Sequence, residues 1–329
     1  MRRRDFITLL GGAAVAWPIA ARAQQPALPV VGFLSPTAPD SDPDRLRGFR
    51  QGLKDAGYVE GENVSIVYRW ADNQPDRLAP LAADLVRRHV AVIAAAGVPS
   101  SQAAKAATRT IPVVFAVGDD PVRHGLVATF ARPGGNVTGI NYLSAELGAK
   151  RLGLLRELVP GAARVGLIAG SGGGADVSAN TYVQESQTAA GMLGLQMQVL
   201  RADTSDEIDA AFATFGRERP DILAVGGGPF YSSRRIQLVQ LGAYHRLPAM
   251  YASRDFAEVG GLMSYGSNTT DAFRQAGAYA GRILKGTKPV ELPVMQTSRF
   301  ELIINHRTAR MLGLSLPPTL IATADEVIE

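Results

Sequence analysis

The sequence contains no cysteine among its 329 residues. Disulfides, thiolate metal ligands and a cysteine nucleophile are therefore excluded. Histidines are also few, and they are scattered at His89, His124, His245 and His306. No two of them have the three- or four-residue spacing that a helical metal site needs. We therefore expect no metal site built on histidine.

Neither positive nor negative charge is in large excess. The net charge is +4, and residues 1–23 hold four arginines and one aspartate, which leaves about +1 for the rest of the chain. A balance so close to neutral gives no reason to expect a nucleic-acid or membrane-surface partner. Apolar residues make up 46% and charged residues 19%, which is typical of a globular protein.

Long apolar runs are absent too, since the stretch at 6–20 is shorter than the roughly 20 residues of a membrane span. A basic start precedes it, and the small residues of 21–23 that follow suit a signal peptidase. We expect an export signal over 1–23, cleaved after Ala23, and a periplasmic mature protein. The run from Arg3 to Ile7 is similar to a twin-arginine signal; a Sec signal with additional arginines is the alternative.

The rest of the chain alternates expected strands with expected helices. Strands are expected at 28–36, 64–71, 91–97, 111–118, 164–170, 196–202, 221–227 and 248–253. Strands that alternate with helices of about 10–15 residues favour parallel sheets covered on both faces. At roughly 100–200 residues per domain, the length favours two such units. The expected fold class is α/β, with two doubly wound parallel-sheet lobes, a hinge and a cleft between the lobes.

The lobe boundaries follow from where this alternation restarts. We assign 24–142 to the first lobe, with a return segment at about 265–295, and 143–264 to the second, with a return segment at about 296–329. The return segments are too short to form a third domain. They are expected to complete the two lobes, so the chain crosses between them more than once.

Candidate ligand-binding residues follow from the strand order. In open parallel sheets, ligands bind at the carboxyl ends of the strands. The candidates at or near strand ends are Ser35, Gly97, Ser100, Ser101, Asp119, Asn180, Gly228, Phe230, Tyr251, Arg254 and Asp255.

Several of these residues allow two interpretations. Ser100 and Ser101 begin an expected helix, so their hydroxyls suit a ligand carboxylate or simply cap the helix. Asn180 has the same ambiguity in the second lobe. Phe230 and Tyr251 stack on a ligand ring or pack in the core.

Charged candidates are equally open. Arg254 and Asp255 clamp a zwitterion or pair with each other. Asp119 and Asp120 suggest a metal site, an acid–base pair or a pocket rim, and nearby oxygen ligands at loop spacing are missing. We therefore expect no metal at this pair, and an acid–base pair and a pocket rim remain open.

Catalytic motifs are absent. There is no Gly-x-Ser-x-Gly elbow and no phosphate-binding Gly-x-x-x-x-Gly-Lys-Ser/Thr loop. The glycine run at 170–175 is separated from the expected helix by 176–180, which argues against a dinucleotide site. We expect no catalytic residue, no metal and no cofactor, and thus a binding protein rather than an enzyme.

Three stretches carry a resemblance to a known family. They are 111–140, which reads IPVVFAVGDDPVRHGLVATFARPGGNVTGI; 283–294, which reads ILKGTKPVELPV; and 304–317, which reads INHRTARMLGLSLP. The chain resembles the ABC-transporter substrate-binding proteins whose better-known members bind tryptophan or tyrosine, over almost all of residues 28–318.

The resemblance implies a periplasmic binding protein fold of type I, whose two lobes close on a small ligand. It implies crossovers near 141–145, 264–268 and 294–300. It also implies a pocket at Ser35, the Gly97 to Ser101 helix start and Asp119, with Asn180 and the 226–231 and 253–255 loops opposite.

The implied function is that of a solute-binding component of an ABC importer. Its ligand is an amino acid or an aromatic or aliphatic carboxylate, and its partners are an inner-membrane permease and ATPase. A monomer is expected. The alternatives are a sensory binding protein for a membrane receptor and an exported hydrolase.

Overall fold

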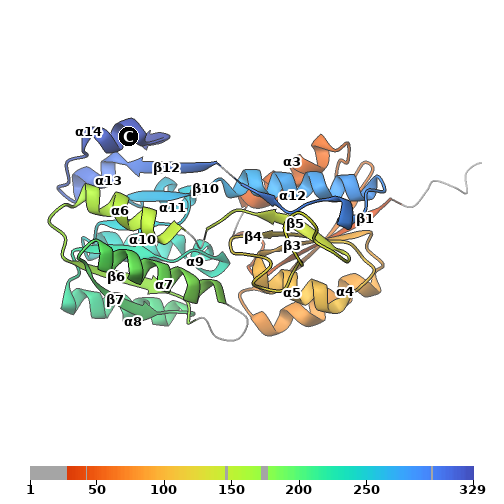
Figure 1. Cartoon of the computed structure of the whole chain (residues 1–329), viewed down its shortest axis with the longest axis horizontal. Helices are drawn as coiled ribbons and strands as arrows, with labels where there is room; N and C mark the ends of the chain where they lie inside the picture. The colour runs from red at the N-terminus through yellow and green to blue at the C-terminus, as the bar shows by residue number, and fades with distance from the viewer. Residues whose placement is uncertain (1–27, 42, 145–146, 172–176, 298) are drawn as a thin grey trace, which may run out of the picture.

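Two lobes lie side by side in the molecule, and each has a sheet between layers of helices (Figure 1). The computed structural model describes residues 28–41, 43–144, 147–171, 177–297 and 299–329. The expected export signal, with cleavage after Ala23, lies outside these residues. The predicted α/β fold with two parallel-sheet lobes is confirmed.

The first lobe is built on a six-stranded sheet in the order β11-β5-β4-β3-β1-β2, with every pair parallel. Its strands are β1 (Val30–Ser35), β2 (Ser65–Trp70), β3 (Val92–Ala96), β4 (Val113–Val117), β5 (Val137–Asn141) and β11 (Met295–Gln296). Its helices are α3 (Pro43–Asp55), α4 (Leu78–Arg87), α5 (Gly97–Ala107) and α12 (Thr269–Leu284), with short 3-10 turns η1 (Pro75–Arg77) and η3 (Pro289–Glu291).

The second lobe is built on a seven-stranded sheet in the order β13-β12-β10-β9-β8-β6-β7. Its strands are β6 (Arg164–Ala169), β7 (Gln196–Arg201), β8 (Ile222–Val225), β9 (Ala249–Tyr251), β10 (Met263–Ser267), β12 (Phe300–Asn305) and β13 (Glu326–Ile328). Its helices are α6 (Gly148–Leu158), α7 (Val177–Met192), α8 (Ser205–Glu218), α9 (Pro229–Ser233), α10 (Arg235–Tyr244), α11 (Arg254–Glu258), α13 (His306–Met311) and α14 (Pro318–Thr323).

One pair in the second sheet differs from the expected parallel arrangement. β10 and β12 are antiparallel. The reason is their direction relative to the other lobe: β10 runs toward the first lobe and is followed by α12, whereas β12 returns from β11 in the first lobe. The second sheet is therefore mixed.

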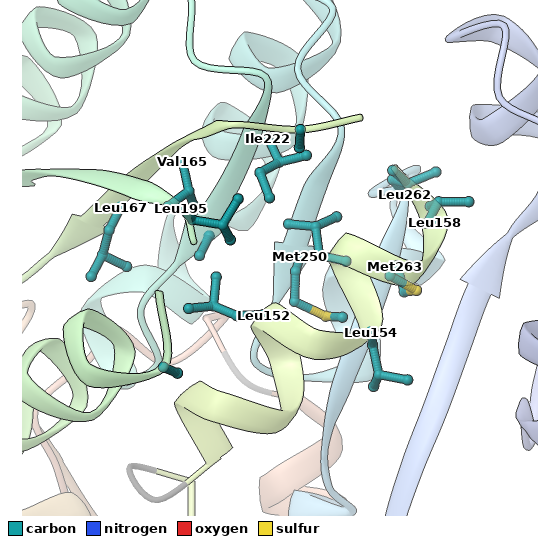
Figure 2. Close-up of a cluster of buried hydrophobic side chains, with 14 of the residues drawn as sticks. Leu152, Leu154, Leu158, Val165, Leu167, Leu195, Ile222, Met250, Leu262 and Met263 are labelled. Carbon is teal, nitrogen blue, oxygen red and sulfur yellow. The ribbon is translucent and has the colours of Figure 1, made fainter. Parts of the chain in front are cut away.

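Helices cover both faces of each sheet. In the first lobe, α3 and α12 bury Phe49 and Phe273 on one face, and α4 buries Leu85 on the other. In the second lobe, α6 packs Leu152 and its neighbours against β6 and β9 (Figure 2), and α8 buries Phe212 on the opposite face. None of the described helices is both long and apolar enough to cross a membrane.

Helices α3 and α12 approach each other closely because glycines line their contact. A Cβ atom on Gly48 would lie 2.3 Å from the carbonyl oxygen of Thr270. A Cβ atom on Gly52 would lie 1.8 Å from the carbonyl oxygen of Arg274. The middle of α3 is thus fixed against the first turns of α12, which directly follow the passage from the second lobe.

Three passages of chain connect the lobes, and hydrogen bonds join them. The side-chain hydroxyl of Ser267, at the end of β10, donates to the carbonyl of Tyr142, which follows β5. The amide of Thr297, after β11, donates to the carbonyl of Asn141 at 2.9 Å. Asn268 alone separates β10 from α12, and its side chain caps α12 by accepting from the amide of Asp271 at 2.9 Å.

The described strands place the second passage after Ser267, within the range 264–268 that the family resemblance implies. The sequence predicts the return to the first lobe at about residue 265, which falls inside β10 of the second sheet. The passage in the structure follows Ser267, because residues 263–267 pair with β9 and β12.

Replacing Gly52 with alanine tests the close packing of α3 on α12. We expect Gly52→Ala to lower the free energy of unfolding by about 3 kcal/mol, because the new methyl group meets backbone that cannot move independently. A Cβ atom on Gly153, in the middle of α6, would instead enter open space. Gly153→Ala should raise stability by about 0.5–1 kcal/mol through helix propensity. Equal effects in urea unfolding would contradict this packing.

Candidate functional site

A cavity of about 150 Å³ lies between the lobes. Its walls come from segments that follow the strands of both sheets, as expected for the carboxyl ends of parallel strands. The lining residues are Arg45, Gly97, Val98, Pro99, Gly118, Asp119, Tyr142, Ser144, Ala169, Gly170, Ala179, Tyr182, Asp203, Gly226, Gly227, Gly228, Pro229, Phe230, Tyr231, Ser232, Ala252, Ser253, Ser267 and Thr269.

Four of the residues predicted from the sequence line this cavity. Gly97 and Asp119 contribute from the first lobe, and Gly228 and Phe230 contribute from the second. Gly97 has a φ of +77°, and Gly228 has a φ of +130°, which favour glycine at both positions. A Cβ atom on Gly97 would also lie 3.3 Å from the ring of Pro229, so this glycine lets the two lobes approach.

Asp119 is 1% exposed and held by two contacts within its own lobe. Its Oδ1 accepts a hydrogen bond from the amide of Asp120 at 2.8 Å, and its Oδ2 lies 2.6 Å from Nε2 of the buried His124. A buried carboxylate is tolerated when it is paired and hydrogen-bonded in this way. Asp119 is thereby held rigidly in the cavity wall.

The side chain of the neighbouring acid, Asp120, stabilises a turn. Its Oδ1 accepts from the amides of Val122 at 2.8 Å and Arg123 at 3.3 Å, which closes the turn after β4. The two adjacent carboxylates therefore do not converge on one ion. Within the described ranges, no group of three or more His, Cys, Asp or Glu side chains could hold a metal.

The polar residues expected from the first lobe lie mostly behind the cavity wall. Ser100 and Ser101 are both fully buried in α5. The hydroxyl of Ser101 donates to the carbonyl of Gly97 at 2.6 Å, and that of Ser100 has no partner among the described residues. Ser35 bonds to Thr37 at 3.0 Å and lines a small apolar hollow beside the cavity.

Asn180 lies in the first turn of α7, which begins four residues earlier than the sequence indicates. Its Oδ1 accepts from Arg201 at 3.2 Å. Asn180 itself does not line the cavity, but its neighbours Ala179 and Tyr182 do. The sequence places the helix start too late because its first residues follow a glycine-rich run with no apolar periodicity.

Tyr251, Arg254 and Asp255 lie away from the cavity. The ring of Tyr251 is 1% exposed and stacks on Phe256 at 4.8 Å between ring centroids, and burial raises the pKa of its hydroxyl. The structure favours core packing for Tyr251 over stacking on a ligand.

Arg254 and Asp255 lie in α11, on the wall of a separate charged groove. The ion pairs of Arg254 are with other acids than Asp255. The guanidinium of Arg254 forms ion pairs with Glu258 at 2.8 Å, Glu301 at 3.1 Å and Glu326 at 2.7 Å. The hydrogen bond with Glu258, more than the other contacts, raises the pKa of Arg254. Two of these acids come from the last thirty residues, which sequence proximity could not suggest.

The sequence reasoning missed several lining residues. Tyr142 and Asp203 each come shortly after a strand, so the strand-end rule could have found them. Arg45, by contrast, lies in α3 and carries no strand-end signal.

Side chains of one lobe donate hydrogen bonds to the other across the cleft. Arg45 of α3 donates to the hydroxyl of Ser232 in α9 at 2.9 Å. Arg235 of α10 donates to the carbonyl of Ser41 at 2.8 Å, and Arg123 donates to the hydroxyl of Thr181 in α7 at 2.8 Å. The lobes are therefore held together around the cavity.

Arg151 of α6 lies behind the cavity and is fully buried. Its guanidinium donates to the carbonyls of Tyr265 at 2.7 Å, Ser144 at 3.1 Å and Ala252 at 3.2 Å, and lies 5.6 Å from the ring centre of Tyr182. Burial lowers the pKa of this guanidinium. Ser144, Ala252 and Tyr182 all line the cavity, so Arg151 fixes three parts of its wall.

Replacing Arg151 tests this role. We expect Arg151→Met to lower the free energy of unfolding by about 3 kcal/mol or more, because it leaves three buried carbonyls without their donor. Arg156→Met, on the same helix, should change stability by about 0.5 kcal/mol or less. Similar unfolding midpoints for the two variants in guanidinium chloride would contradict this role, because the hydrogen bonds of Arg151 would then contribute nothing measurable to stability.

Comparison with known proteins assigns the family. The ABC transporter substrate binding protein family matches residues 31–328. The chain belongs to this family. It is 28% identical over 269 residues to the tyrosine-binding protein of Clostridioides difficile strain R20291, an alignment that covers 82% of this chain and 76% of that protein.

Solved structures agree with the family's two-lobed fold. A conserved domain protein from Vibrio cholerae has a TM-score of 0.83 at 26% identity, covering 91% of this chain and 99% of that chain. An ABC domain from Streptococcus pneumoniae in complex with L-Trp has a TM-score of 0.83 at 24% identity, covering 92% and 100%.

A further solved structure of lower similarity has the same fold. A ligand-free, open substrate-binding protein from Clostridium difficile has a TM-score of only 0.66, at the same 24% identity and with 92% and 99% coverage.

Proposed function

We propose that this protein is the solute-binding component of an ABC importer and works in the periplasm. It closes its two lobes around one small solute and presents the closed form to an inner-membrane permease with its ATPase. It acts as a monomer, and it binds its solute without converting it. An amino acid or an aromatic or aliphatic carboxylate is the ligand class.

The observation that carries the proposal is the cavity enclosed between hydrogen-bonded lobes. Its volume suits a small solute rather than a polymer. Its described lining includes one cationic side chain, Arg45, and two carboxylates, Asp119 and Asp203, amid apolar and aromatic residues. Charges of both signs beside aromatic rings complement a zwitterion with an apolar side chain.

The relatives support the same ligand class. One curated relative is a tyrosine-binding protein, and one structural neighbour holds L-Trp. The family membership supports the partnership with a permease. The basic and apolar start of the sequence supports export.

Thermal unfolding of the mature chain, residues 24–329, tests the proposal. L-tyrosine, L-tryptophan, benzoate, 3-phenylpropionate and D-glucose would each be added in excess. A true ligand at a hundred times its dissociation constant should stabilise the folded state by about 2.7 kcal/mol through mass action. Stabilisation by the sugar alone, or turnover of an added solute, would contradict the proposed class.

Asp119 is proposed to contact the polar end of the solute. We expect Asp119→Asn to weaken binding of the stabilising acid at least tenfold, or by about 1.4 kcal/mol, because a rigid buried carboxylate in the wall is lost. Asp120→Asn keeps the cavity wall intact and should leave affinity within about twofold. Calorimetric titration of both variants checks this, and unchanged affinity in Asp119→Asn would remove this residue from the site.

A further inference from the structure

Among the described charged residues of the cavity lining, Arg45 is the one that also borders two neighbouring hollows. It lies in the first turn of α3 and lines the cavity between the lobes. It also lines the outer charged groove, with Arg235 and Asp255, and the apolar hollow formed by Phe33 and its neighbours. Its guanidinium therefore stands where the enclosed cavity meets the outside of the cleft.

The first lobe fixes this guanidinium from two sides. Gly48 and Gly52 seat α3 directly on the backbone of α12, so the start of α3 has little freedom to shift. The guanidinium carbon lies 5.8 Å from the centre of the Phe273 ring, in a cation–π contact. A cation held in this way is preorganised before any solute enters.

The same guanidinium reaches the second lobe. It donates to the hydroxyl of Ser232 at 2.9 Å, and Ser232 also lines the cavity. The carbonyl of Ser232 in turn accepts from Arg235 at 3.0 Å. Arg45 is thus at once a group of the cavity wall and a contact between the lobes.

The balance of charges in the cavity indicates what Arg45 binds. Among the described lining residues, Arg45 carries the cationic side chain, and Asp119 and Asp203 carry the carboxylates. Both oxygens of Asp119 already accept contacts from Asp120 and His124, and Asp203 accepts from the amide of Ser171. A planar guanidinium offers paired donors that match the two oxygens of a carboxylate.

We propose that Arg45 is the residue that makes the site specific for acids: it binds the carboxylate of the solute and, through Ser232, couples that contact to closure of the lobes. This inference rests on the proposed binding function and assigns its specificity to a named residue. A solute without the carboxylate still fits the cavity but forms no ion pair with the guanidinium. Such a solute binds more weakly and favours the closed form less.

Matched pairs of probes test the inference. L-tyrosine is compared with tyramine, which lacks the carboxylate, and 3-phenylpropionate with 3-phenyl-1-propanol. Calorimetric titration of the mature protein should show that the acid of at least one pair binds at least tenfold more tightly than its partner. In Arg45→Gln this preference should fall to about twofold or less. Arg45→Lys keeps the charge and should retain part of the preference.

Two control variants separate acid recognition from closure. Arg235→Gln removes a hydrogen bond between the lobes, to the carbonyl of Ser41, and leaves the cavity cation in place. Arg235→Gln should lower the affinity for both probes of a pair equally. Arg47 lies on the same helix as Arg45, and its side chain is 72% exposed. Arg47→Gln should therefore leave the affinity for both probes unchanged.

The outcomes distinguish this inference from the proposed function. If Arg45→Gln weakens acid and non-acid equally while remaining folded by circular dichroism, Arg45 is only a contact between the lobes and the inference is wrong. If the wild-type protein binds an acid no better than its partner, binding stands but recognition of the carboxylate fails. If only the non-acid probes bind, the proposed ligand class fails together with the inference.

Discussion

The buried guanidinium of Arg151 joins parts of the chain that no single helix or strand could hold together. Its acceptors follow β5, follow β9 and lie within β10. A cation removed from water is costly unless charge-assisted hydrogen bonds replace its hydration, and three backbone carbonyls do so here. Since Ser144 and Ala252 also line the cavity, the shape of the binding wall and the course of the chain between the lobes depend on one side chain.

The cavity follows from that arrangement. The passages between the lobes are bonded to each other through Tyr142, Ser267 and Thr297, so the carboxyl ends of both sheets face a common space. The positive-φ residue Gly97 brings the backbone of the first lobe close to Pro229 of the second. The polar groups of the wall then come from rigid segments rather than from long loops, which keeps their positions fixed relative to a bound solute.

The sequence predicted the architecture well because buried strands and amphipathic helices have distinct periods. Asp119 and Phe230, which the strand-end rule selects, line the cavity. The rule failed where position along a strand was not enough. Tyr251 ends a strand but points into the core beside Phe256. Arg254 is bound by acids far along the chain. Arg45 was missed because it reaches the cavity from a helix, and only the packing of α3 on α12 brings it there.

The hydrogen bonds of Arg123 and Arg235 join the lobes without involving a solute. Each contributes about 0.5–1.5 kcal/mol to this arrangement, so under the proposed function they favour the closed form even when the cavity is empty. A solute cannot enter while the lobes are shut, and its association rate is then limited by how often they part. Once the solute is inside, the same bonds slow its escape. The pairs at the cleft rim therefore set residence time separately from the groups that recognise the solute, and the two properties can change independently.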